Sequence, residues 1–354
     1  MTLEHRVRAH LAEIDRTGLR RTMRPPSGVD LSSNDYLCLS THPLITERMA
    51  KAVQELGAGS TGSRLLRGDR EAFESIEQKF ATFKGTERAL YFSTGYLANL
   101  AVLTTFPQEG DVVFSDSLNH ASLIDGVRLS RAKREIYPHN TVPAARGHFL
   151  VTESLFSMDG DFAPLPELST IEANLIVDEA HSVGLYGNNG SGLIEDNEVF
   201  LSINPCGKAL GVSGAFVCGP AWAIEYMVQT ARPFIFSTAA PPSIAAALDA
   251  SLDIIAAEPE RRARVRSLSR FLRAKLAMPD SDSPILPIMI GDNTRAVALA
   301  EALQRDGFDI RAIRPPTVPA GTARLRLSLN CNLTEAILDR FVASLEHSQC
   351  AASS

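Results

Sequence analysis

The sequence has few of the residues that mark a specialised structural class. Only 6% of its 354 residues are aromatic, with a single tryptophan, and 21% are charged. Lys plus Arg is 35 and Asp plus Glu is 41, so the net charge of -6 gives no positive excess for nucleic acid or for an anionic membrane. Hydrophobic residues make up 45%, which excludes a disordered or collagen-like chain and predicts a large core.

Cysteine is also scarce, with five residues and no Cys-x-x-Cys pair. An odd number without that spacing argues against a disulfide framework and against a structural zinc site, and the histidines form no ligand cluster. The N-terminus lacks the apolar stretch of a signal peptide. The uncharged run between Lys208 and Glu225 contains three glycines and a proline and does not predict a membrane span. We therefore expect a cytoplasmic protein with no bound metal.

Short apolar runs alternate with amphipathic helical patterns over most of the chain. Apolar runs at 89–92, 112–114, 149–151 and 175–177 each end in polar residues. All-apolar strands between helices are typical of a parallel sheet that is covered on both faces. After residue 258 the pattern changes to helix, strand, helix, strand and helix. The prediction is an α/β fold with a mainly parallel sheet and a small C-terminal α+β domain, divided into an N-terminal helical arm (1–34), a large domain (35–257) and a small domain (258–354).

Residues 57–62 (GAGSTG) match the dinucleotide-binding pattern G-x-G-x-x-G. That pattern indicates a dinucleotide site only where it lies between a strand and a helix, whereas residues 45–56, which precede it, have helical periodicity. A flexible loop is therefore favoured over a nicotinamide dehydrogenase.

Two strand ends are candidates for ligand contacts. Gly95 and Tyr96 follow a predicted strand and open a helix, where backbone N–H groups suit a phosphate, although taken alone this turn is better explained as a simple helix cap. Asp178 follows the run at 175–177, at the edge where open α/β sheets bind ligands. A helix cap is its alternative role.

Two basic features are further candidates. Lys208 lies in a glycine-rich, uncharged setting (GKALGVSG), where desolvation lowers a lysine pKa and favours a nucleophilic amine; a surface lysine is the alternative. Arg324 and Arg326 alternate with leucines and so share one face of a predicted strand. Such a pair suits a carboxylate or phosphate, or lies on a solvated edge.

Taken in order, six segments resemble the pyridoxal-phosphate (PLP) enzymes of fold type I, and within them the α-oxoamine synthases. The resemblance extends from about residue 19 to residue 345. The matching segments are 32–37 (SSNDYL), 119–122 (NHAS), 156–161 (FSMDGD), 178–181 (DEAH), 211–214 (GVSG) and 314–327 (RPPTVP running on to RLRL).

The resemblance implies roles for individual residues. Lys208 would form the Schiff base with PLP and later move the α-proton, Asp178 would pair with the pyridinium nitrogen, His181 would bind the phenolic oxygen, and His120 would stack on the ring. It also implies cofactor contacts from Gly95, Tyr96, Ser157 and Thr238 and substrate contacts from Arg20, Asn34, Thr317 and Arg326, with Arg324 as the alternative to Arg326. Thr238 would reach the phosphate in the neighbouring subunit, so a homodimer is expected.

The resemblance further implies a decarboxylative condensation of L-alanine with a pimeloyl thioester, either pimeloyl-CoA or pimeloyl-carrier protein, in biotin biosynthesis. The stretch at 314–319 favours the pimeloyl substrate. A sister synthase that joins glycine or serine to another acyl-CoA, such as 2-amino-3-oxobutyrate CoA ligase, is the nearest alternative. A non-catalytic partner subunit is another, although the presence of Lys208, Asp178, His181 and His120 argues against it.

One departure from the family pattern concerns the phosphate. The threonine that usually lies three residues before the lysine is replaced by Pro205, which has neither a hydroxyl nor an N–H. Ser202, Asn204 or Cys206 could compensate, or fewer groups hold the phosphate.

Overall fold

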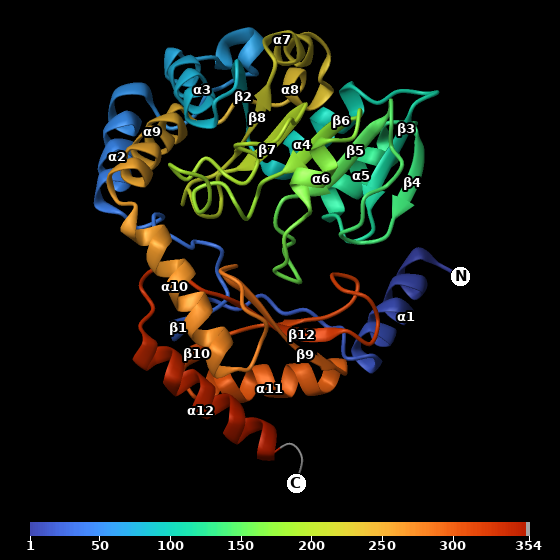
Figure 1. The fold of residues 1–354 in the computed structure, drawn as a ribbon, viewed down its shortest axis with the longest axis vertical. Coiled ribbons are helices and arrows are strands. Elements are labelled where there is room, and N and C mark those ends of the chain that lie inside the picture. Colours follow the sequence, from blue (N-terminus) through green and yellow to red (C-terminus); the bar gives the residue numbers. More distant parts are fainter. Residues whose placement is uncertain (352–354) are drawn as a thin grey trace. The chain divides into compact units, whose positions relative to one another are not determined.

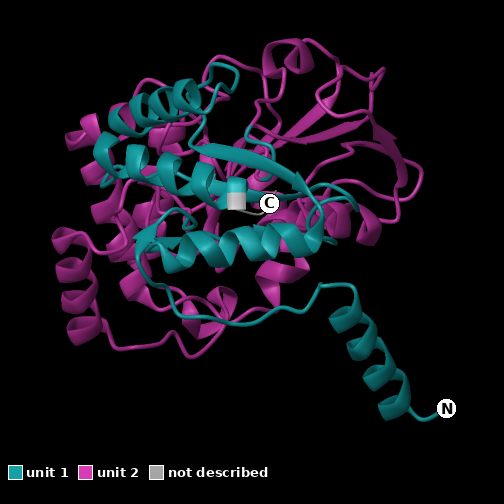
Figure 2. Cartoon of the chain, turned by 90° about the horizontal axis from the view of Figure 1, so that it is seen from below, with its two compact units in different colours: residues 1–33, 158–160, 264–354 teal, residues 34–157, 161–263 magenta. Residues whose placement is uncertain are grey.

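The computed structural model describes residues 1–351. Packing divides the chain into two compact units, which Figure 2 shows in separate colours. Unit 1 comprises Met1–Ser33, Met158–Gly160 and the chain from Arg264 onward, and unit 2 comprises Asn34–Ser157 and Asp161–Ala263. The three-part division expected from the sequence remains a prediction.

Unit 2 is built on a seven-stranded sheet with the order β2-β8-β7-β6-β5-β3-β4 (Figure 1). Its strands are β2 (Arg88–Phe92), β3 (Val112–Asp116), β4 (Lys133–Tyr137), β5 (Phe149–Glu153), β6 (Asn174–Asp178), β7 (Leu201–Pro205) and β8 (Ala215–Gly219). The pairs from β4 to β7 are parallel, whereas β8 runs antiparallel to both β7 and β2. The sheet is therefore mainly parallel, as the apolar runs predict.

Both faces of this sheet are buried, which explains its apolar strands. On β6, Ile176 packs into one hydrophobic cluster while Leu175 and Val177 pack into another. Because side chains alternate along a strand, these clusters lie on opposite faces. Val151 and Leu150 of β5 divide in the same way.

Helices supply the covering layers of unit 2. They are α2 (Pro43–Leu56), α3 (Glu71–Lys84), α4 (Gly95–Thr105), α5 (Ala121–Leu129), α6 (Leu165–Ser169), α7 (Ala221–Thr230), α8 (Arg232–Ile235) and α9 (Pro242–Ala257), with a π-helical turn at Arg64–Gly68. On α3, Phe73, Ile76 and Phe80 form the buried stripe that their helical spacing predicts. Gly85 ends that helix in the left-handed conformation at φ 68°.

Unit 1 holds two small sheets. In the first, β9 (Ile285–Gly291) and β11 (Ala312–Ile313) flank β12 (Ala323–Ser328) in antiparallel pairing; in the second, β1 (Val29–Asp30) pairs in parallel with β10 (Phe308–Asp309). Its helices are α1 (Leu3–Arg16), α11 (Asn293–Arg305) and α12 (Glu335–Ala351), and α10 (Glu260–Lys275) begins in unit 2 and continues into unit 1. Leu325 and Leu327 of β12 belong to the core of this unit.

The elements expected after residue 258 are present as α10, β9, α11, β12 and α12. A helix, α2, precedes Gly57, so residues 57–62 lack the strand that a dinucleotide site requires. Within residues 1–351, no helix has the length and hydrophobicity needed to cross a bilayer.

Candidate active site

Asp178 is the last residue of β6 and is 4% exposed. Its Oδ1 accepts a hydrogen bond from the backbone N–H of Ala180 at 2.9 Å, and its Oδ2 accepts one from Asn99 Nδ2 at 2.7 Å. A carboxylate oxygen can only accept here, which fixes the orientation of the Asn99 amide. The carboxylate is thus held rigidly at the carboxyl end of the sheet.

His120 begins α5 as its N-cap. Its Nδ1 accepts the backbone N–H of Ser122 at 3.3 Å and lies 2.7 Å from Ser122 Oγ, which also accepts from Asn99 Nδ2 at 2.9 Å. Because Nδ1 accepts, the neutral ring carries its proton on Nε2. Burial lowers the pKa of His120, and the charge of Lys208 adds to that effect while Asp178 opposes it. His120 therefore presents a neutral Nε2–H donor.

His181 follows Asp178 by three residues and is 3% exposed. Its Nδ1 lies 2.6 Å from the hydroxyl of Tyr36, which in turn lies 3.2 Å from Asn34 Oδ1. This contact joins the first part of unit 2 to the strand end of β6.

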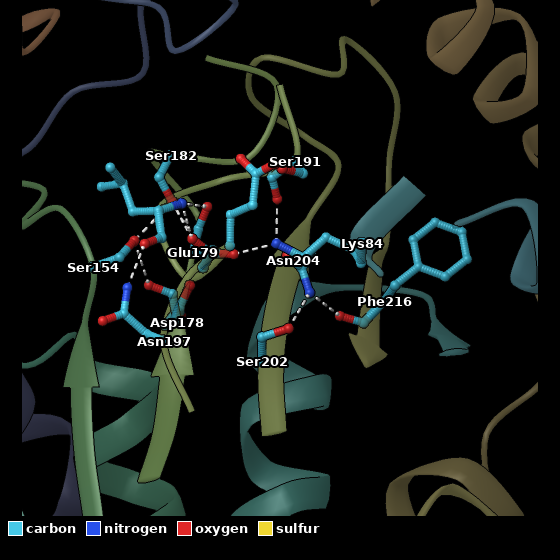
Figure 3. A network of polar contacts seen from close by, with 12 residues as sticks. Lys84, Ser154, Asp178, Glu179, Ser182, Ser191, Asn197, Ser202, Asn204 and Phe216 are labelled. Atoms are coloured by element: carbon cyan, nitrogen blue, oxygen red, sulfur yellow. Dashed lines mark hydrogen bonds and ion pairs between the residues drawn. The ribbon is translucent and has the colours of Figure 1, made fainter. Parts of the chain in front are cut away.

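Glu179 lies between Asp178 and His181 in the sequence and anchors this segment in the core (Figure 3). Its Oε2 pairs with the ammonium of Lys84, and both side chains are almost completely buried. Its Oε1 accepts the backbone N–H of Leu193 at 2.6 Å and the hydroxyl of Ser182 at 3.0 Å. A Cβ on Gly192 would lie within 2.5 Å of both carboxylate oxygens, so glycine is required there.

Lys208 lies in the loop that joins the antiparallel strands β7 and β8. The loop is closed by hydrogen bonds from Cys206 N to Gly214 O at 2.8 Å and from Val212 N to Cys206 O at 3.0 Å. Gly214 has a φ of 92°, and a Cβ there would overlap the ring of Tyr91. Tight loop geometry therefore explains the glycines around the lysine.

The turn before α4 supplies backbone donors. The hydroxyl of Thr94 caps the helix by accepting from Leu97 N at 3.1 Å. Helix geometry leaves the N–H groups of Gly95 and Tyr96 without intrahelical acceptors, and the helix dipole favours an anion beside them. A Cβ on Gly95 would lie 2.8 Å from Cγ of Pro205, so the proline ring packs directly against this turn.

A cavity of about 370 Å³ in unit 2 gathers most of the predicted site. Its lining includes Asn34, Gly95, Tyr96, His120, Asp178, His181 and Lys208, together with Pro205. The lining residues that were not predicted include the polar side chains of Asn99, Ser122 and Glu153. Among the buried residues of α4, Asn99 is the one with a polar side chain. The sequence does contain this signal, as an amide within the apolar run at 97–103.

Other predicted residues lie elsewhere. Thr238 lines a separate small cavity, of about 20 Å³, that also includes Ser93. Ser157 does not line the larger cavity. Its backbone N–H interacts with the carboxyl group of Glu153, and Glu153 does line that cavity. Arg20 and Thr317 line one cavity of about 660 Å³ in unit 1.

The two arginines of β12 are both buried. Arg324 forms an ion pair with Asp159 at 2.5 Å and donates to the carbonyl of Met158. Arg326 donates to Ser328 Oγ at 2.6 Å. Each of the two arginines thus has a polar partner within unit 1.

Comparisons with known proteins identify the class of this site. A family model described as aminotransferase class I and II matches residues 26–345. The chain therefore belongs to the aminotransferase class I and II family, and it is a PLP-dependent enzyme of fold type I.

Within this class, the chain is 45% identical to the 8-amino-7-oxononanoate synthase of Paraburkholderia xenovorans (strain LB400), over 95% of this chain and 96% of the relative. Its relatives make it a PLP-dependent acyltransferase related to the synthases of the biotin pathway. A solved SPT (serine palmitoyltransferase) structure with PLP superimposes with a TM-score of 0.91, at 28% identity over 99% of this chain and 100% of that one. The 8-amino-7-oxononanoate synthase of Francisella tularensis superimposes with a TM-score of 0.82, at 31% identity over 93% and 99%.

The residues of the 370 Å³ cavity fit PLP. Asp178 offers a rigid carboxylate for a protonated ring nitrogen, and the turn at Gly95 offers N–H donors for a phosphate. Lys208 lines the same cavity. Among the residues that the structure describes, two buried acceptor atoms of the lining residues, Asn99 Oδ1 and Glu153 Oε1, have no hydrogen-bond partner. Such atoms are typical of a site that binds a polar ligand.

Proposed function

We propose that this protein condenses L-alanine with a pimeloyl thioester to give 8-amino-7-oxononanoate, carbon dioxide and the free thiol. One C–C bond forms between the α-carbon of alanine and the thioester carbonyl carbon. The C–S bond and the bond from the α-carbon to the alanine carboxylate break. No oxidant or reductant is needed. The observation that carries the proposal is the cavity that brings Lys208, Asp178, His120 and His181 together in a chain 45% identical to a named synthase.

Bound PLP supplies an electron sink for negative charge at the α-carbon of the amino acid. Asp178 would hold a proton on the ring nitrogen, because Asn99 and the N–H of Ala180 keep its carboxylate in place. Lys208 would remove the α-proton of alanine. The Nε2–H of His120 would donate to the carbonyl oxygen of the thioester as charge develops there.

The arginine-lined cavity of unit 1 supports an anionic acyl substrate. Besides Arg20 and Thr317, its lining holds four more arginines but only one acidic residue, Glu301. Burial and the charge of Arg21 lower the pKa of Arg314, as expected where like charges crowd together. A pimeloyl carboxylate, or the phosphates of CoA, would relieve this repulsion.

Following the family resemblance, we propose that Arg326 binds the carboxylate of alanine. Arg324, which forms an ion pair with Asp159, is the alternative. We further propose that the active unit is a cytoplasmic homodimer in which Thr238 contributes to the cofactor phosphate of the neighbouring subunit.

The direct test is to incubate the purified protein with PLP, L-alanine and pimeloyl-CoA, and to measure 8-amino-7-oxononanoate by mass spectrometry. Carbon dioxide from carboxyl-labelled alanine should appear in equal amount. Lys208→Ala should lower turnover by at least about 10²- to 10⁴-fold, since it removes the proton-transfer group. Lys133→Ala, at an exposed position on β4, is the matched control and should leave turnover unchanged. Full turnover by the Lys208 variant would refute the mechanism.

A sister synthase is the second candidate, because the SPT structure superimposes with a higher TM-score than the Francisella synthase. The same assay with glycine or serine and with longer acyl-CoA donors separates the two. Higher kcat/KM with serine and a long-chain acyl-CoA would replace the proposal. Comparing pimeloyl-CoA with pimeloyl-carrier protein identifies the donor.

A further inference from the structure

Asn99 is a buried residue in the wall of the site to which no role has been assigned. It lies on α4 and is 1% exposed. Its NH₂ group donates to Asp178 Oδ2 at 2.7 Å and to Ser122 Oγ at 2.9 Å. These two bonds use both N–H groups of the amide. Asn99 therefore joins the end of β6 to the first turn of α5.

The hydrogen bonds in this cluster have a single consistent direction. The Asp178 carboxylate accepts, which places the NH₂ group of Asn99 toward it and toward Ser122. Ser122 Oγ accepts from that NH₂ group, so its own O–H is left to donate to His120 Nδ1, 2.7 Å away. The backbone N–H of Ser122, 3.3 Å from the same ring nitrogen, requires the same direction. The donors therefore run from Asn99 through Ser122 to His120.

Packing of α4 does not account for an amide at this position. The other buried residues of α4 share one hydrophobic cluster with side chains of α5 and β6; they are Ala98, Ala101, Val102 and Leu103. An aliphatic side chain at position 99 would extend that contact without burying a polar group. The partners of the amide are instead Asp178 and Ser122, which line the cavity, and Ser122 in turn contacts His120, which also lines it.

We propose that Asn99 is a positioning residue of this site: its amide holds the carboxylate of Asp178 and keeps the O–H of Ser122 directed at Nδ1 of His120. A donor on Nδ1 opposes protonation there, so the ring stays neutral with its proton on Nε2. Without Asn99, the hydroxyl of Ser122 can turn and accept from Nδ1–H, which favours a charged ring. The inference rests on the proposed function, because it assumes the roles proposed there for Asp178 and His120.

Replacing Asn99 removes no charge from the surroundings of His120. The charges of Asp178 on β6 and Lys208 in the loop after β7 act on the ring, and the carboxyl group of Glu153 on β5 interacts with the backbone N–H of His120. All three groups are retained in the variants below. A change in the pKa of His120 therefore reports the hydrogen bonds to its ring.

Two variants remove different parts of this chain of donors. Asn99→Leu has a similar volume and loses the bonds to both Asp178 and Ser122. Ser122→Ala loses the hydroxyl beside His120 but keeps the bond from Asn99 to Asp178. Thr105→Val, on the same helix, is the control, because within residues 1–351 the buried hydroxyl of Thr105 has no hydrogen-bond partner. All variants are first compared by thermal unfolding.

The first arm measures the pKa of His120 by NMR on the whole chain labelled with ¹⁵N-histidine, before PLP is added. The signals of His120 are assigned by their loss in His120→Asn. N99L should raise this pKa by about 0.5–1, because the Ser122 hydroxyl becomes free to accept from the ring. S122A should raise it less, because it removes the donor without supplying an acceptor, and T105V should leave it unchanged.

The second arm titrates each protein with PLP and follows the visible absorption band. N99L should bind PLP about three- to tenfold more weakly, because the Asp178 carboxylate has lost one of its two donors. S122A should match the unmodified protein within about twofold, because that donor remains.

The proposal is overturned if N99L leaves the pKa of His120 unchanged, if S122A raises it more than N99L does, or if N99L binds PLP as tightly as the unmodified protein. An effect of T105V equal to that of N99L would assign the change to α4 as a whole and would also overturn it. If N99L does not fold, Asn99→Ala takes its place with the same order expected. The first arm uses neither cofactor nor substrate, so failure to form 8-amino-7-oxononanoate would leave this test intact.

Discussion

Replacing Lys84 by methionine should destabilise unit 2 more than any surface substitution. Lys84 and Glu179 are 1% and 0% exposed in their side chains, so neither charge is compensated by water. Lys84 also donates to the carbonyl of Ser191. The variant would leave the Glu179 carboxylate buried without a cation, and such losses cost about 3–5 kcal/mol.

Within residues 1–351, Glu179 has no second cation beside Lys84 in an ion pair. Its Oε1 already accepts from Leu193 and Ser182, and Gly192 lies too close for the carboxylate to move in that direction. With an unfolding slope of roughly 2.5 kcal/mol per molar urea, the transition midpoint should fall by about 1–2 M. Urea unfolding followed by far-UV circular dichroism measures this shift.

The double variant K84M/E179Q tests the cause. If the cost arises from an unpaired charge, removing both charges should recover much of the stability, and the coupling energy should be about 1–3 kcal/mol. Lys51→Met, an exposed lysine on α2, is the matched control. A loss below about 1 kcal/mol for K84M, or a double variant as unstable as the sum of the single ones, would refute the reasoning.

Two other substitutions have outcomes that follow from the structure. Burial alone would lower the pKa of His139, but hydrogen bonds and charges from Asp116 and Asp161 outweigh burial and raise it. The stability that protonated His139 adds is therefore complete below pH 6.5, its ordinary pKa, and is lost as the pH rises through the pKa of the folded protein. His139→Asn should therefore cost about 1–2 kcal/mol in urea unfolding at pH 6 and progressively less toward pH 9. Pro205→Thr places a hydroxyl beside Gly95, where a phosphate is expected, and should raise PLP affinity about three- to tenfold in titrations of the apoprotein.

These two predictions have their own controls. His148→Asn shows whether any histidine loss produces the same pH trend; a penalty for His139→Asn that stays constant or grows with pH would contradict the assignment. Pro220→Thr, at the start of α7, repeats the proline change away from the cavity. Equal PLP affinity of P205T and the unmodified protein would show that the proline does not weaken phosphate binding.

Much of unit 2 was predictable because its strands are uniformly apolar and end in polar residues. Asp178 and Lys208 were identified from that pattern together with the family resemblance. Glu153 has the same relation to β5 as Asp178 has to β6, so the signal was present. The position of Glu153 beside Asp178 depends on which strands are neighbours, and only the fold brings these two residues into register.

Other features of the fold and of the site could not be predicted from the local sequence pattern. Strand β7 contains Ser202, Asn204 and Pro205, so its sequence does not read as a buried strand, yet all five of its residues are buried. The NH₂ group of Asn204 donates to Ser202 Oγ and to the carbonyl of Phe216. The tautomer of His120 likewise depends on a network that reaches Asn99, 21 positions earlier in the chain. The role expected of Thr238 depends on a second subunit, which one sequence does not describe.

The parallel pairing of β1 with β10 has a consequence for synthesis. Val29 is matched with Phe308 and Asp30 with Asp309, so the first strand of the chain pairs with a segment made about 280 residues later. At roughly 5–20 residues per second, the ribosome needs about 15–60 s to deliver that partner. Throughout this interval the nascent N-terminal segment exposes an unpaired strand, whereas the seven-stranded sheet is complete in sequence once Gly219 has been made. Unit 1 is therefore the last part to assemble, and the newly made chain should be most sensitive to proteases and most dependent on chaperones at its N-terminus.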